Sequence, residues 1–229
     1  MPRKPRWMQL AADAAYHVMN RGQNRQTVFA DADDLHYFLS LLTRYRQRFG
    51  FRLYHYCLLS NHFHLLLHLD DPRRLSALMA GLLLAYVRYC QRRHRCVGHV
   101  WQGRFKSPLV QRESYWLSCG RYIERNPLEA GMVTEPWSYP WSSCRYYALG
   151  EADALVTEDP CSTELSPDLE RRKQLWRSFL MEADPRAEVV RRGDWVVGDE
   201  CFRQQKGLLL GRPIPRQVGR PRKLSARMG

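Results

Sequence analysis

The chain has 229 residues, and its 36 lysines and arginines outnumber 23 aspartates and glutamates, which gives a formal charge of +13. This excess favours a polyanionic partner, of which nucleic acid is the first candidate. No apolar run approaches the roughly 18 residues of a membrane-spanning helix, and the N-terminal residues lack the apolar core of a secretory signal. We therefore expect a cytoplasmic protein without membrane contact.

The first half of the chain alternates between strand-like and helix-like patterns. Residues 15–22 are apolar and rich in β-formers up to an Asn-Arg-Gly turn signal. Residues 31–50 open with acidic side chains, continue with helical spacing and end in glycine. Residues 51–59 and 62–69 are two β-like runs separated by two turn residues, which predicts a hairpin.

The next segments predict two more helices around a basic, aromatic stretch. Residues 72–94 begin with proline and end in a cluster of cations, both typical of a helix. Residues 98–111 are expected to form a short strand or strand pair, and residues 114–131 a third helix. The order β-α-β-β-α-β-α predicts an α+β, ferredoxin-like or RRM-like sandwich, with helices on one face of an antiparallel sheet.

The composition changes near residue 150, where the chain becomes acidic and rich in turn residues. We therefore expect a main domain over residues 1–149, a connector with a small helical extension over 150–210, and a basic tail over 211–229. The seven cysteines are scattered and form no Cys-x-x-Cys pair, which argues against a disulfide framework and a cysteine zinc site.

Two histidines alternate with a phenylalanine in the strand-like segment 61–68, Asn-His-Phe-His-Leu-Leu-Leu-His. Strand geometry places His62 and His64 on one face, with Cα atoms roughly 7 Å apart. Both imidazoles could then bind one divalent ion. His68 shares the face, but it lies about 13 Å from His64, too far for the same ion. Taken alone, such a motif is more often a pair of core histidines.

A second pair of polar side chains lies on the third expected helix. Tyr122 and Asn126 are four residues apart and therefore share a helix face. They supply a phenol and a neutral oxygen ligand. Taken separately, Tyr122 is more often a core aromatic, and Asn126 is an ordinary residue before a proline.

Together these segments resemble the HUH single-tyrosine transposases and, within them, the REP-associated tyrosine transposases, which act on repetitive extragenic palindromes. The resemblance rests on the stretches HVMNRGQNRQTVF, LLSNHFHLLLHL, HVWQGRFKSPLV and GRYIERNPLEAGMV. These stretches follow the family's order and lie within about residues 15–147.

The resemblance implies an HUH endonuclease fold over the main domain and a specific set of site residues. His62 and His64 would be ligands of Mg²⁺ or Mn²⁺, Asn126 a third ligand, and Tyr122 the nucleophile. The implied reaction cleaves single-stranded or hairpin DNA through a 5′-phosphotyrosine intermediate and rejoins strands by the reverse step. The sequence identifies no general base and does not distinguish a monomer from a homodimer.

A single-stranded or hairpin substrate requires cations for its backbone and flat side chains for unpaired bases. The segment 101–106 interleaves both kinds, although a tight turn with a charged rim explains it equally well. The tail contains a Gly-Arg-Pro core flanked by basic residues, as in AT-hooks, and a generic basic tail is the alternative. The candidate DNA-binding residues are Asn20, Arg21, Arg25, Trp101, Arg104, Lys106, Arg220, Arg222 and Lys223.

Three other functions remain compatible with the residues. A replication initiator or relaxase-type nickase would share the chemistry of the HUH class. A non-catalytic nucleic-acid-binding protein would share its fold and basic surface but would not depend on metal. A cysteine-free, zinc-stapled domain is a weaker alternative, in which chelation would lower the melting temperature sharply.

Overall fold

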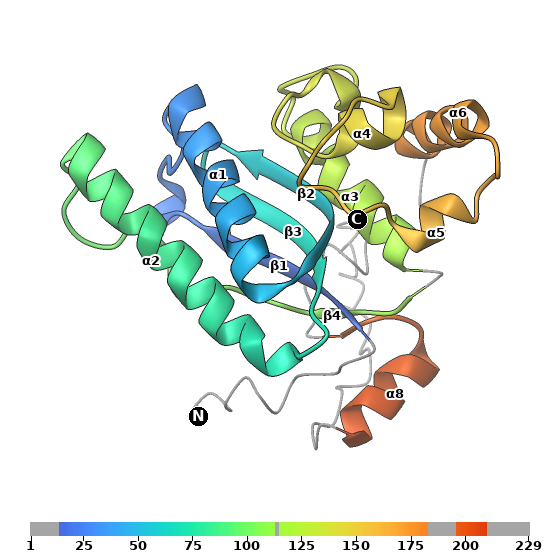
Figure 1. Cartoon of the computed structure of the whole chain (residues 1–229), viewed down its shortest axis with the longest axis horizontal. Helices are drawn as coiled ribbons and strands as arrows, with labels where there is room; N and C mark the ends of the chain where they lie inside the picture. Colours follow the sequence, from blue (N-terminus) through green and yellow to red (C-terminus); the bar gives the residue numbers. More distant parts are fainter. Residues whose placement is uncertain (1–13, 113–114, 183–195, 210–229) are drawn as a thin grey trace, which may run out of the picture.

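The structure is a computed structural model that describes residues 14–112, 115–182 and 196–209. Five strands form one open sheet in the order β2-β3-β1-β4-β5, shown in Figure 1. The strands are β1 (Ala15–Arg21), β2 (Arg52–Leu59), β3 (His62–His68), β4 (Leu109–Val110) and β5 (Val196–Val197). The helices are α1 (Ala32–Phe49), α2 (Leu75–His94), α3 (Trp116–Glu129), α4 (Cys144–Leu149), α5 (Pro160–Thr163), α6 (Leu169–Met181) and α8 (Glu200–Leu209).

The pairing of the strands is antiparallel except between β4 and β5, which are parallel. The predicted hairpin is present, with β2 and β3 joined through a two-residue turn. The predicted α+β class and the order of elements in the main domain are therefore confirmed. The strand β5 comes from the C-terminal extension, which the sequence pattern did not indicate.

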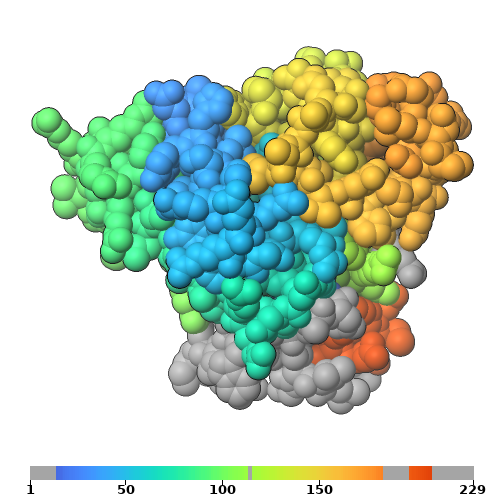
Figure 2. Space-filling model, in the orientation of Figure 1, coloured from blue at the N-terminus to red at the C-terminus, as the bar shows by residue number. Residues whose placement is uncertain are grey.

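Helices α1 and α2 cover one face of the sheet. Alternate strand residues such as Val18, Phe63 and Leu65 form one buried cluster with Phe38 of α1 and Leu82 of α2. Figure 2 shows this face as a continuous surface of α1 and α2, beside the yellow and orange residues of α4 to α6. Asp31 caps the start of α1, and Gly50 ends it in the left-handed conformation that glycine adopts without strain.

Helix α3 lies on the opposite face, so the expectation that the helices share one face is wrong. Leu66 of β3 and Cys57 of β2 form a second buried cluster with Cys119 and Ile123 of α3. Both faces of the central strands are apolar, which explains why β2 and β3 are buried along nearly their whole length. The face covered by α3 is the one to which His62 and His64 belong.

The C-terminal extension packs against α3. Helix α6 contacts α4 and α3, and Arg121 and Arg125 of α3 donate hydrogen bonds to main-chain carbonyl groups of Phe179 and Leu180 near its end. Residues 150–182 therefore brace the helix that carries Tyr122 and Asn126. None of the helices in the described ranges is long and apolar enough to cross a bilayer.

Candidate active site

Strand register places His62 and His64 of β3 beside residues of β1. His62 faces Arg21, and His64 faces Met19. Residues that face each other on neighbouring antiparallel strands project to the same side of the sheet. The two imidazole rings have centroids 5.0 Å apart, so both rings occupy one region of the α3 face.

Helix α3 brings Tyr122 and Asn126 to this pair of rings. The Tyr122 ring lies edge-on to the His64 ring, with centroids 5.6 Å apart. The Asn126 side chain lies close enough to His62 to act as a hydrogen-bond acceptor for the protonated form of that ring. The four residues that the sequence singled out therefore meet at one place, although 47 residues of chain, 69–115, separate β3 from α3.

The Asn126 amide is oriented by the proline that follows it. Pro127 has no N–H group and so leaves the Ile123 carbonyl without its usual helical donor. Asn126 Nδ2 donates to that carbonyl at 3.2 Å and to the Tyr122 carbonyl at 2.7 Å. Because both amide hydrogens are directed to the helix, Oδ1 is the atom available to a neighbouring imidazole or cation.

His62 and His64 are neutral at physiological pH. Burial, with a smaller contribution from Arg21, lowers the pKa of His62 to about 4. Burial also holds the pKa of His64 well below its usual range, with further lowering by His17, His62 and Arg21. Neutral imidazole is the form that binds metal. His62 Nδ1 lies 2.6 Å from Asn61 Oδ1, so Nδ1 is the protonated donor and Nε2 keeps its lone pair.

These observations fit a divalent metal ion. The donor set would be two neutral imidazoles and the Asn126 amide oxygen, and the Asn61 contact is the kind of outer hydrogen bond that orients metal-binding histidines. Within the described parts of the chain, no group of three or more His, Cys, Asp or Glu side chains is arranged to hold a metal. A metal here would therefore depend on the amide or on substrate oxygens to complete its coordination.

His17 of β1 also belongs to this site, and the sequence analysis missed it. Its Nε2 lies 2.8 Å from His64 Nδ1, and its ring lies 5.8 Å from the Tyr122 ring between centroids. Burial lowers its pKa to about 3. The only signal in the sequence was a histidine in a predicted strand, and strand pairing alone brought it next to His64.

Positive charge lies on the same face as the site. Met19 of β1 pairs with His64 along one edge of its strand and with Lys106 along the other edge. The Lys106 side chain therefore lies on the same face as His64 and two strand spacings, roughly 10 Å, from it. Lys106 and Arg21 are exposed, as are Arg25 and Arg104.

Two other candidate DNA-binding residues are buried. Trp101 is 8% exposed and packs among Phe29, Phe63 and Tyr86. Asn20 donates a hydrogen bond to the Gly103 carbonyl at 3.2 Å. Both residues therefore hold the basic segment 101–106 against β1. The tail candidates Arg220, Arg222 and Lys223 lie outside the described residues, and His68 Nδ1 lies 3.7 Å from Asp70 Oδ1 at the far end of β3.

A buried ionic network joins α3 to β2 and to the extension. A β-bulge in β2 turns His55 toward α3, beside Tyr54. His55 binds Glu124 of α3 at 2.8 Å and Asp159 of the extension at 3.0 Å, and all three side chains are fully buried. Gly120 permits this approach, because a Cβ atom there would lie 2.6 Å from His55 Nε2.

The Glu124 carboxylate accepts two more hydrogen bonds from distant parts of the chain. Ser143 Oγ donates to it at 2.6 Å, and Trp176 Nε1 of α6 donates at 2.8 Å. Although burial opposes protonation of His55, its hydrogen bonds to Asp159 and Glu124 raise its pKa to about 9. A buried cation between two carboxylates therefore joins β2, α3 and the extension.

This network predicts that stability falls on the alkaline side of neutrality. Because the folded-state pKa of His55 exceeds its ordinary value of 6.5, its contribution is complete below pH 6.5 and is lost as pH rises through 9. We expect the free energy of unfolding to fall between these values by up to about 1.4 kcal/mol per pH unit. Urea titrations of the wild type and His55→Gln would test this, and parallel pH profiles would contradict it.

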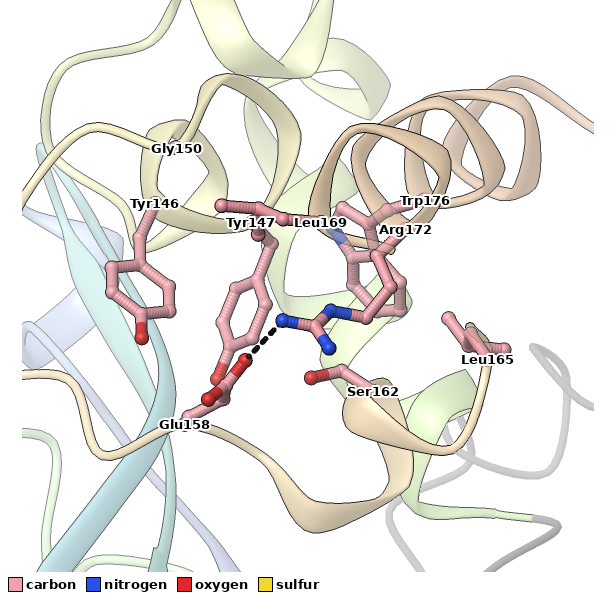
Figure 3. A pocket seen from close by; sticks show the side chains of 9 residues that line it. All are labelled: Tyr146, Tyr147, Gly150, Glu158, Ser162, Leu165, Leu169, Arg172 and Trp176. Carbon is pink, nitrogen blue, oxygen red and sulfur yellow. Dashed lines mark hydrogen bonds and ion pairs between the residues drawn. The ribbon is translucent and has the colours of Figure 1, made fainter. Parts of the chain in front are cut away.

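A cavity of about 240 Å³ lies between α4 and the extension, and its lining includes no residue of the His62 and Tyr122 cluster. Figure 3 shows Tyr147 and Trp176 in its wall and the ion pair between Arg172 and Glu158 across it. Since Trp176 donates to Glu124, the cavity adjoins the buried network. It contains none of the residues predicted from the sequence.

An antiparallel sheet with a His-x-His pair opposite a helical tyrosine is the arrangement expected of the HUH class. Residues 11–126 match the family model described as "Transposase IS200 like". The chain therefore belongs to the family of IS200-like transposases.

The fold is similar to a solved structure whose title is "Structure of the REP associates tyrosine transposase bound to a REP hairpin". The TM-score is 0.54 at 16% sequence identity, and the match covers 69% of this chain and 93% of the other. At this identity the likeness concerns the fold. No curated protein matches the chain.

Proposed function

We propose that this protein is a metal-dependent strand transferase that cuts and rejoins single-stranded DNA through Tyr122. The observation that carries the proposal is the meeting of Tyr122, His62, His64 and Asn126 on one face of the sheet. Membership of the IS200-like transposase family supports it. The structural neighbour is described as bound to a REP hairpin, which favours a hairpin-forming DNA substrate here.

In the proposed reaction the Tyr122 hydroxyl oxygen attacks a backbone phosphorus. A bond forms between this oxygen and phosphorus, the bond from phosphorus to the 3′ oxygen breaks, and the 3′ oxygen takes up a proton as the phenol loses one. The products are a 5′-phosphotyrosine and a free 3′-hydroxyl. One phosphodiester replaces another, so a second 3′-hydroxyl can reverse the step and join strands without nucleotide hydrolysis.

The residues around Tyr122 have distinct tasks. His62, His64 and Asn126 would hold Mg²⁺ or Mn²⁺, which when bound supplies positive charge for the phosphate oxygens. Arg21 and Lys106 lie on the same face and would hold the DNA backbone. The exposed Arg25 and Arg104 extend this basic surface.

The metal ligands are tested by His62→Ala and His64→Ala, with His68→Ala as the matched control on the same strand. We expect each of the first two variants to lose Mn²⁺-dependent cleavage of a hairpin oligonucleotide by at least about a hundredfold while retaining DNA binding. The His68 variant should cleave like the wild type, because His68 pairs with Asp70 at the other end of β3.

Denaturing gel electrophoresis measures cleavage, and a mobility-shift assay measures binding. Cleavage that is unchanged in both site variants would contradict the metal assignment. Binding without cleavage by the wild type, with or without Mn²⁺, would instead indicate a non-catalytic DNA-binding protein.

A further inference from the structure

We propose that His17 is a positioning residue that holds the His64 imidazole in the orientation and tautomer that a metal ligand needs. The inference rests on the proposed function of the His62 and His64 site. It adds a residue from β1, a strand to which the sequence assigned only DNA contacts.

The geometry places His17 against the inner nitrogen of His64. Met19 lies directly opposite His64 in the strand register, and His17 is two residues earlier on the same face of β1, within diagonal reach. The two rings have centroids 5.0 Å apart, and His17 Nε2 lies 2.8 Å from His64 Nδ1. His17 is 0% exposed and His64 is 4% exposed, so water does not compete for this hydrogen bond.

The contact constrains which nitrogen of His64 can bind a metal. Nδ1 faces His17 at hydrogen-bond distance, which leaves no room for an ion between the two rings. Nε2 is therefore the ligand atom, and it needs a lone pair. The His64 proton then lies on Nδ1, where His17 Nε2 accepts it.

The contact also determines which ring nitrogen of His17 carries its proton. If its Nε2 accepts, its own proton lies on Nδ1, which is buried and has no hydrogen-bond partner among the described residues. In the opposite arrangement His17 Nε2 donates, and the His64 proton moves to Nε2 and blocks the ligand. The buried pair thus has two tautomeric arrangements, and metal binding requires the one in which His17 is the acceptor.

The second nitrogen of His17 also distinguishes it from an ordinary packing residue. A leucine of similar size would fill the same space without leaving a buried polar atom unpaired, and such atoms cost about 1–3 kcal/mol. His17 also contacts the Tyr122 ring edge-on, with centroids 5.8 Å apart. It therefore links the metal-ligand histidine to the ring of the proposed nucleophile.

The test compares two substitutions of His17 by Mn²⁺ binding to the full-length protein. His17→Gln places an amide near the position of Nε2 and can accept from His64, whereas His17→Leu fills the space without an acceptor. We expect Leu to weaken Mn²⁺ binding by about 10- to 100-fold, the usual effect of removing an outer hydrogen bond. Gln should bind within a fewfold of the wild type.

Calorimetric titration with Mn²⁺ alone, without DNA, gives the affinity, and electron paramagnetic resonance of the bound Mn²⁺ reports its coordination. Wild-type affinity in the Leu variant would overturn the proposal, as would equal weakening by Gln and Leu. If the Leu variant does not fold, His17→Asn replaces it: its shorter amide cannot reach His64, and the same loss is expected.

The His64→Ala variant separates this inference from the proposed function. Loss of Mn²⁺ binding in His64→Ala with unchanged binding in His17→Leu would refute the role of His17 alone. Unchanged binding in both would show that the ion is held elsewhere, and the proposed metal site would fail as well.

Discussion

Replacing Tyr122 with phenylalanine is expected to abolish the covalent protein–DNA adduct. The substitution removes only the hydroxyl oxygen, so the ring contacts with His64 and His17 remain. We expect adduct formation to fall by at least about a thousandfold, because a nucleophile has no substitute within its own side chain. The adduct is measured by denaturing electrophoresis with a labelled hairpin oligonucleotide and Mg²⁺ or Mn²⁺.

Tyr115→Phe is the matched control, since Tyr115 precedes the same helix and packs at its start. It should form adduct as the wild type does, and both variants should bind the oligonucleotide with unchanged affinity. An adduct in Tyr122→Phe at the wild-type level would assign the nucleophile to another residue. Mass spectrometry of the adduct would then locate that residue.

Replacing Glu124 with glutamine is expected to remove a large part of the protein's stability. Glu124 is fully buried, binds His55 and accepts from Ser143 and Trp176. The neutral amide leaves the His55 cation with Asp159 as its remaining charge partner. Removing one partner of a buried ion pair costs about 3–5 kcal/mol of stability. This is a large share of the free energy of unfolding of a typical domain, roughly 5–15 kcal/mol. Urea unfolding followed by circular dichroism measures the loss.

Glu129→Gln provides the comparison on the same helix. Its carboxylate lies 3.9 Å from Arg125 at the surface, with 34% of the side chain exposed. We expect a change of less than about 1 kcal/mol, as for other surface pairs. Similar losses in both variants would show that the buried network does not stabilise α3 beyond an ordinary surface contact.

The position of the network links stability to function. Glu124 lies on α3 between Tyr122 and Asn126, and its partners come from β2, the start of α4 and the extension. Residues 150–182 therefore contribute to the placement of the proposed nucleophile. The extension acts on the site through α3.

Local patterns in the sequence were enough for the elements of the main domain. Short runs of apolar, β-forming residues marked β2 and β3, and helical spacing of apolar residues marked α1 and α2. The prediction that His62 and His64 lie on one face of a strand followed from strand geometry alone. Tyr122 and Asn126 shared a face through helix geometry in the same way.

Contacts between distant segments could not be inferred from these patterns. His55 looks like any residue of an apolar strand, yet its two carboxylate partners lie 69 and 104 residues away. Trp101 was read as a surface aromatic because its neighbours are basic, but the pairing of Gly22 with Trp101 brings it into the core. Helix α3 was placed with α1 and α2, although both faces of the central strands are apolar.

The sequence by itself determined the chemistry that the site offers: two imidazoles on one strand face, and a phenol and an amide on one helix face. Those spacings depend only on the repeat of a strand or a helix. The tertiary structure decided that the histidine pair meets the Tyr122 and Asn126 pair. It also decided that His17 lies at hydrogen-bond distance from His64, and that the buried His55 cation joins α3 to the extension. These outcomes depend on strand register, a β-bulge and the side of the sheet chosen by α3, which are set by contacts between residues far apart in the chain.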